Sequence, residues 1–198
     1  MAQAWLVVGL GNPGLGYART RHNVGFMTAD ELAGRARLRW KRARGANAQV
    51  VTTTLDALVA GGAANVHVTI AKPQTFMNNS GDAVAPLARD SRVAPDHIVV
   101  VHDEIDLDVG QLRVKVGGGD NGHNGLKSLR ARLGTGEFYR VRIGVSRPPG
   151  NGDPIDWVLG TFPAAQREDV KLSITEAADA VLSLLTDGLV ETQSRFNR

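Results

Sequence analysis

The chain has 198 residues and a formal net charge of +3 at pH 7, and 42% of its residues are hydrophobic. This composition is typical of a globular protein and excludes a disordered one, and the length fits a single domain over residues 1–198. The lack of cysteine excludes disulfide bonds, a thiolate zinc site and a cysteine nucleophile.

The strands expected in the first half of the chain cover residues 5–11, 48–55 and 66–71. The first is an apolar run that ends in glycine, typical of a buried strand that leads into a turn. The second is rich in Val and Thr and is expected at a sheet edge. A helix is expected over residues 21–36. A second helical stretch, 79–90, contains Pro86, which restricts it to short pieces or a bend.

In the second half, residues 98–101 give the strongest signal for a buried strand. Further strands are expected over 111–116, where the pairing is antiparallel, and over 139–145. Helices are expected over 124–133 and from Pro163 to Gly188. This alternation predicts an α/β domain of three layers, in which helices flank a twisted central sheet that is mixed and mostly parallel.

No run of about 18 apolar residues is present, so no membrane span is expected. Residues 1–6 lack the basic start of a signal peptide, and the predicted location is therefore cytoplasmic. Residues 1–152 carry 19 basic and 12 acidic side chains, whereas residues 153–198 carry 4 and 8. A basic body favours a polyanionic partner, although ordinary charge scatter explains the numbers equally well.

The glycine turn at residues 9–14 matches the G-x-G-x-x-G pattern of dinucleotide sites. Such a site needs a helix that opens at the third glycine, but residues 15–21 are too long and too polar for that tight turn. The favoured interpretation is a rigid loop at the carboxyl end of a strand, which presents Asn12. A dinucleotide-dependent oxidoreductase is kept as the alternative.

The histidines show no spacing typical of a zinc site. Asp103 follows the strand over 98–101 and His102, at a position where a carboxylate could hold the Nδ1–H of a neighbouring imidazole. The other ring nitrogen could then take a proton from water. Asp103 could equally be a solvated loop residue.

Amide and glycine-rich segments point to a substrate with carbonyl and phosphate groups. Asparagines near short loops could bind a peptide or ester, although asparagine also forms turns and helix caps: Asn12, Asn78, Asn79, Asn121 and Asn124. The loop 116–125 precedes a helix and could expose backbone N–H groups to a phosphate.

Four segments together resemble the motifs of bacterial peptidyl-tRNA hydrolase. They are residues 9–25 with Asn12, Tyr17 and His22, residues 72–81, residues 102–107, and residues 117–127. Their order and spacing agree with that family, and the similarity extends to about residue 190. The resemblance implies an enzyme that hydrolyses the ester of peptidyl-tRNA and so recycles tRNA from prematurely released peptidyl-tRNA.

The resemblance also implies residue roles. His22 would be the general base, Asp103 would orient it, and Asn12 would distinguish a blocked from a free aminoacyl group. Residues expected to bind the 3′ CCA end and the peptide are Tyr17, Phe76, Met77, Asn78, His123 and Asn124. Arg113, Lys115 and Arg142 would hold phosphates of the acceptor arm. No metal or other cofactor is implied, and the family is usually monomeric.

Two segments depart from the family pattern. Asp120 and Asn121 replace neutral small residues or histidine, and the added carboxylate is expected to weaken phosphate contact locally. Residues 108–110 replace a turn that more commonly contains proline.

The basic segment over residues 35–44 supports a second alternative function. Six of residues 35–44 are Arg or Lys, with Trp40 among them. This segment could make the chain a non-enzymatic RNA-binding module, but a solvated helix end and loop is the favoured interpretation.

Overall fold

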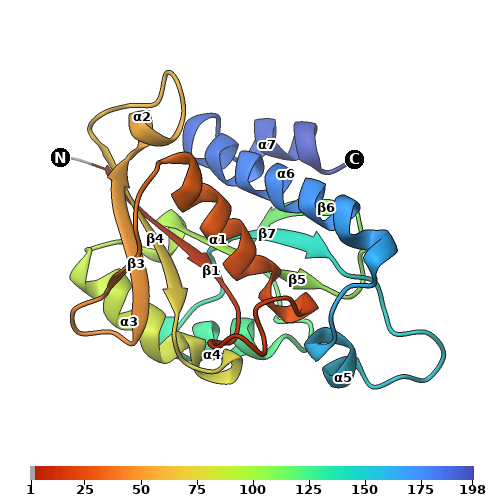
Figure 1. The fold of residues 1–198 in the computed structure, drawn as a ribbon. Coiled ribbons are helices and arrows are strands. Elements are labelled where there is room, and N and C mark those ends of the chain that lie inside the picture. Colours follow the sequence, from red (N-terminus) through yellow and green to blue (C-terminus); the bar gives the residue numbers. More distant parts are fainter. Residues whose placement is uncertain (1–2) are drawn as a thin grey trace.

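A computed structural model describes residues 3–198, which build one seven-stranded sheet covered by helices on both faces (Figure 1). The strands are β1 (Gln3–Gly9), β2 (Lys41–Arg42), β3 (Ala48–Thr54), β4 (Val66–Pro73), β5 (Ile98–Glu104), β6 (Leu112–Val116) and β7 (Tyr139–Gly144). Their order is β2-β3-β4-β1-β5-β7-β6. The central strands β4, β1, β5 and β7 are parallel, and the outer strands pair antiparallel. The predicted mixed α/β sheet is confirmed.

The helices are α1 (Val24–Arg35), α2 (Leu55–Leu58), α3 (Ser80–Asp90), α4 (Asn124–Leu133), α5 (Pro154–Leu159), α6 (Arg167–Thr186) and α7 (Leu189–Phe196). Helices α1 and α6 cover one face of the sheet, and α3 and α4 cover the other (Figure 1). Short 3-10 turns precede α1 and α3: η1 (Arg21–Asn23) and η2 (Met77–Asn79). No helix within residues 3–198 is long and apolar enough to cross a membrane.

The central strands are apolar on both faces because both faces are covered. In β5, Val99 and Val101 pack into the cluster below α1 and α6, whereas Ile98 and Val100 pack into the cluster below α3 and α4. Successive side chains of a strand point to opposite faces, so a continuous valine run supplies both layers.

Three expectations about the elements were wrong. Strand β3 is not at the edge, because Lys41 and Arg42 of the basic segment form β2 outside it. Helix α3 runs continuously through Pro86, since its buried face packs on the sheet and on α4. The chain does not end with one helix: Gly188 (φ 82°) turns it into α7. Helices α2 and α5 were also not predicted.

Close packing between glycine backbones fixes the start of α1 over the ends of β1 and β5. A Cβ added to Gly25 would collide with the carbonyl oxygen of Val101 and with the backbone of Leu10, and one added to Gly9 would collide with the carbonyl of Gly25. The N–H of Leu10 donates to Val101 O at 3.0 Å, and the N–H of Phe26 donates to Leu10 O at 3.1 Å. The turn η1 is therefore held beside the end of β5.

We expect Gly25→Ala to lower the free energy of unfolding by about 1–3 kcal/mol or more, because the added methyl group would collide with backbone atoms of Leu10 and Val101. The matched control is Gly34→Ala in the same helix, where an added Cβ meets no atom of residues 3–198 within 4 Å. That change should instead stabilise the protein by up to about 1 kcal/mol through helix propensity. Urea unfolding of both variants tests the pair, and equal effects would contradict the packing argument.

Candidate active site

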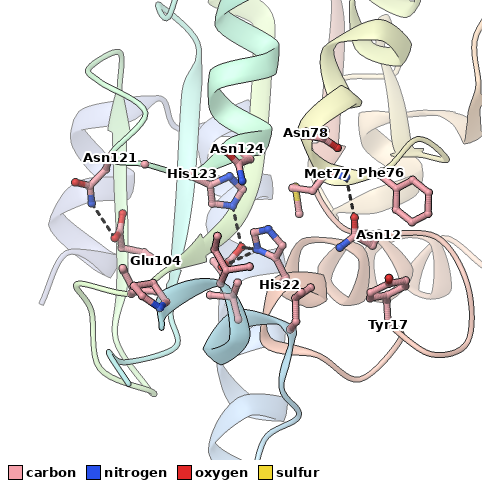
Figure 2. Close-up of a pocket in the computed structure, with 17 residues that line it drawn as sticks. Asn12, Tyr17, His22, Phe76, Met77, Asn78, Glu104, Asn121, His123 and Asn124 are labelled. Atoms are coloured by element: carbon pink, nitrogen blue, oxygen red, sulfur yellow. Dashed lines mark hydrogen bonds and ion pairs between the residues drawn. The ribbon is translucent and has the colours of Figure 1, made fainter. Parts of the chain in front are cut away.

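A cavity of about 330 Å³ opens at the carboxyl edge of the central strands (Figure 2). Nine residues that the sequence singled out for catalysis or for the 3′ end line it: Asn12, Tyr17, His22, Phe76, Met77, Asn78, Asp103, His123 and Asn124. They come from the four motif segments, which are far apart in the chain. The cavity is therefore assembled by the sheet topology.

The centre of the cavity is a hydrogen-bonded pair formed by His22 and Asp103. Nδ1 of His22 lies 2.9 and 3.0 Å from the two carboxylate oxygens of Asp103. His22 is 9% exposed and Asp103 is 3% exposed. Because a carboxylate accepts, Nδ1 carries the proton and Nε2 keeps a lone pair. Nε2 has no hydrogen-bond partner within residues 3–198, so it is available to a ligand or water.

A second imidazole reaches the same carboxylate. Nε2 of His123 lies 2.8 Å from Oδ1 of Asp103, and Figure 2 shows the His22 and His123 rings next to each other in the cavity. Nδ1 of His123 accepts from the N–H groups of Gly125 (3.1 Å) and Leu126 (3.4 Å), so His123 caps α4. These bonds require a lone pair on Nδ1 and a proton on Nε2. The sequence placed His123 at the site, but its bond to Asp103 was not foreseen.

The two histidines determine the charge state of Asp103. Burial by itself would raise the pKa of this carboxyl, but the facing imidazoles of His22 and His123 hold the pKa well below its usual range. Asp103 is thus an anion that accepts from two donors.

His22, Asp103 and His123 are also the one group of three potential metal ligands found within residues 3–198, with ligand atoms inside 4.8 Å of one another. The hydrogen bonds argue against a metal at these atoms. Nδ1 of His22 and Nε2 of His123 already carry protons toward Asp103. A metal ion would need both lone pairs and would disrupt the cap of α4.

His102 precedes Asp103 but lies in the core, at 1% exposure, and does not line this cavity. Its Nδ1–H donates to the carbonyl oxygen of Asp103 at 2.7 Å. Burial and the neighbouring His123 lower the pKa of His102 well below its ordinary value. The imidazole of His102 is therefore neutral.

Asn12 is held so that its amide nitrogen is free. Its Oδ1 accepts from the N–H of Met77 at 2.7 Å, and its backbone exchanges two hydrogen bonds of 2.9 Å with the Asn23 side chain. In Figure 2 the Asn12 nitrogen points to the side of His22. Asn12 therefore offers a donor to the cavity, whereas Asn78 and Asn124 are exposed at the rim.

One wall of the cavity was missed by the sequence analysis. Helix α5 contributes apolar side chains to it: Pro154, Ile155, Val158 and Leu159. The start of this helix could have been predicted from the pair Asp153-Pro154, since Asp is favoured at the N-cap and Pro at the first helical position. In the structure the Asp153 side chain accepts from the N–H of Ile155 at 2.7 Å. The Arg21 guanidinium lies 3.6 Å from the centre of the Trp157 ring and donates to Trp157 O at 3.2 Å. These contacts tie α5 to η1.

A neighbouring cavity of about 460 Å³ is cationic. Lys115 and Arg142 line it together with Arg140, but Arg113 lines neither cavity and donates to its neighbour's carbonyl, Leu112 O. Lys115 faces Arg140 across β6 and β7, as Arg113 faces Arg142. The residues expected to bind phosphates are therefore divided: two lie at this second cavity and one lies outside it.

Two alternative interpretations meet structural obstacles. No helix opens at Gly14, since the next helix, α1, starts only at Val24, and the dinucleotide interpretation is wrong for that reason. The basic segment does not form an independent module. It contains the end of α1 and the strand β2, which is part of the same sheet.

Comparison with known proteins places the chain in a family. The family model for peptidyl-tRNA hydrolase matches residues 6–198. The peptidyl-tRNA hydrolase of Cutibacterium acnes is 52% identical over the full length of both chains. That of Mycolicibacterium smegmatis is 50% identical over 98% of this chain and 97% of its own.

The fold leads to the same family. The crystal structure of peptidyl-tRNA hydrolase from Acinetobacter baumannii superposes with a TM-score of 0.87 at 32% identity, covering 100% of this chain and 96% of that one. With a family match over nearly the whole sequence and full-length relatives near 50% identity, this chain belongs to the peptidyl-tRNA hydrolase family.

Proposed function

We propose that this chain hydrolyses the ester bond that joins a peptidyl group to the terminal ribose of tRNA, with a water molecule activated by His22. The observation that carries the mechanism is the orientation of the His22 ring. Nδ1 is held by the anionic Asp103, and the unpartnered Nε2 faces a cavity lined by amides. A single oriented imidazole and a neutral carbonyl donor suffice for an ester, whose leaving alcohol needs less assistance than an amine.

In the proposed reaction, Nε2 of His22 takes a proton from water while the water oxygen bonds to the ester carbonyl carbon. The carbonyl oxygen becomes an oxyanion, to which the free amide nitrogen of Asn12 donates. The carbon–oxygen bond to ribose then breaks, and the protonated His22 returns its proton to the ribose oxygen. The negative charge of Asp103 stabilises the intermediate imidazolium.

The remaining lining residues fit the two ends of such a substrate. The Tyr17 and Phe76 rings meet edge to face with centroids 6.3 Å apart, and they offer a surface to a base or a peptide side chain. The cationic cavity fits phosphates of the acceptor arm.

The proposed reaction needs no metal. Nδ1 of His22 and Nε2 of His123 already carry protons directed at Asp103, so neither nitrogen has a lone pair for a metal ion. A monomer and a cytoplasmic location stay predictions.

The decisive assay incubates the protein with N-acetylaminoacyl-tRNA and with unblocked aminoacyl-tRNA and follows ester loss. Rapid loss of the blocked ester alone supports the proposal, and no loss of either ester would refute it.

We expect His22→Ala to lower turnover about 10²–10⁴-fold, because the general base is lost. Asp103→Asn should cost less, since the ring remains but its orientation and charge partner are weakened. The double variant should be close to His22→Ala alone, because residues that act as a unit are not additive. Full multiplication of the two losses would show that they act independently. Near-ultraviolet circular dichroism checks that the fold is kept.

His123 is expected to be a positioning residue that holds Asp103. We expect His123→Ala to lower kcat about tenfold, as for the loss of a hydrogen bond to a charged group, and to leave KM within about twofold of the parent value. The reason is that Asp103, with one donor fewer, is held less firmly beside Nδ1 of His22. His123→Asn can still cap α4 and separates the two effects. If only stability falls and kcat does not change, His123 has a structural role alone.

Asn12→Asp should replace the free donor by a carboxylate, while its other oxygen still accepts from the N–H of Met77. We expect about a 10²-fold loss of kcat/KM on N-acetylaminoacyl-tRNA, because the developing oxyanion loses its donor. The loss on unblocked aminoacyl-tRNA should be smaller, since the substrate ammonium can pair with the new charge. Asn78→Asp, at the exposed rim, is the comparison variant. A larger change in selectivity for Asn78→Asp would place the discriminating residue elsewhere.

A further inference from the structure

The catalytic cavity and the cationic cavity share two lining residues, Glu104 and Asn121. Figure 2 shows the Asn121 side chain reaching the Glu104 carboxylate at the end of the site opposite Tyr17. Asn121 has a backbone φ of 49°, a left-handed conformation that asparagine tolerates better than most residues. The side chain of Asn121 therefore stands where the two cavities meet.

The amide of Asn121 bridges two carboxylates. Its Nδ2 donates to Oε1 of Glu104 at 3.1 Å and to Oδ2 of Asp106 at 2.8 Å. The other oxygens of these groups bind arginines: Oε2 of Glu104 lies 2.9 Å from Arg142, and Oδ1 of Asp106 lies 2.7 Å from Arg147. The bond from Asn121 is the largest cause that lowers the pKa of Asp106. Asn121 thus holds one oxygen of each carboxylate, while an arginine holds the other. The N–H of Asp106 also donates to Oε1 of Glu104 at 3.1 Å.

Lys115 lies in the same cationic cavity but has no carboxylate partner. It forms no ion pair with any of residues 3–198, because Glu104 and Asp106, which line the cavity with it, pair with Arg142 and Arg147. Burial and the neighbouring charges of Arg142 and Arg140 lower the pKa of Lys115. An ammonium crowded by two guanidinium groups gains most from an anionic ligand, and a carboxylate released nearby would take that place.

We propose that Asn121 is a positioning residue: by holding Glu104 and Asp106 away from the Lys115 ammonium, it keeps the cationic cavity open to a phosphate group of the substrate. This inference rests on the proposed function. Without the amide, the two carboxylates compete with phosphate for Lys115. The substrate should then bind more weakly, although the groups around His22 are unchanged.

Three variants test the idea. Asn121→Gly removes the amide without adding charge, and glycine accepts the positive φ. Asn121→Asp puts a third carboxylate between the first two. The double variant Asn121→Asp with Asp106→Asn restores one amide facing a carboxylate and the original net charge. Each is assayed for kcat and KM on N-acetylaminoacyl-tRNA, and for the Kd of uncharged tRNA by fluorescence anisotropy.

We expect Asn121→Gly to raise KM and Kd about threefold and Asn121→Asp to raise them about tenfold, with kcat within about twofold of the parent. The double variant should return both constants toward the parent values. Thermal unfolding confirms that each variant is folded.

Unchanged binding in Asn121→Gly would overturn the proposal, since charge alone would then explain Asn121→Asp. A loss confined to kcat would overturn it as well, because it would point to the placement of His123. A parent protein that hydrolyses neither ester would refute the proposed function, and the Kd measurements would still test the role of Asn121.

Discussion

The buried carboxylate of Asp103 is the point at which the two helical layers of the protein meet. A carboxylate at 3% exposure is costly unless donors replace its water, and here two imidazoles do so. His22 comes from the turn before α1, on one face of the sheet, and His123 from the start of α4, on the other. The charge at the end of β5 therefore requires both layers to be in place, and it orients His22 only when they are.

The two cavities near Asp103 have different linings, and together they fit the proposed substrate, in which an ester is attached to a polyanion. Beside His22, Asp103, Glu104 and His123, the first cavity is lined by amides and apolar side chains, an environment that strengthens hydrogen bonds to the oxyanion of the proposed reaction. The cationic side chains proposed to bind phosphate line the neighbouring cavity, where Lys115 faces Arg140 across β6 and β7. Like charges in opposite positions destabilise a sheet, so this arrangement favours binding over stability.

The base and the apolar wall are coupled through one side chain. The buried Arg21 precedes His22, stacks on Trp157 of α5 and donates to its carbonyl group. An antiparallel bridge between Thr20 and Thr161 joins the same two segments. A displacement of α5 would therefore also shift His22, so the apolar wall of the cavity helps to hold this imidazole in place.

Much of the fold could be predicted because local periodicity reports burial. The valine run at 98–101 and the alternation at 139–145 identified β5 and β7, and Gly134 ended α4 as expected. Elements without such signals were missed. Lys41 and Arg42 form a strand only because β3 offers an open edge, and Pro86 stays in α3 because packing outweighs the lost hydrogen bond.

For the site, the sequence by itself determined which residue types are present and, through the similarity of four motifs, that His22, Asp103 and Asn12 belong to one centre. Tertiary structure alone decided how they are used. Hydrogen bonds from residues distant in sequence leave the nitrogen of Asn12 free, give Asp103 a second histidine, and set Asn121 between two carboxylates. A side chain's free donor or acceptor depends on which atoms the fold has already paired, and no local pattern contains that information.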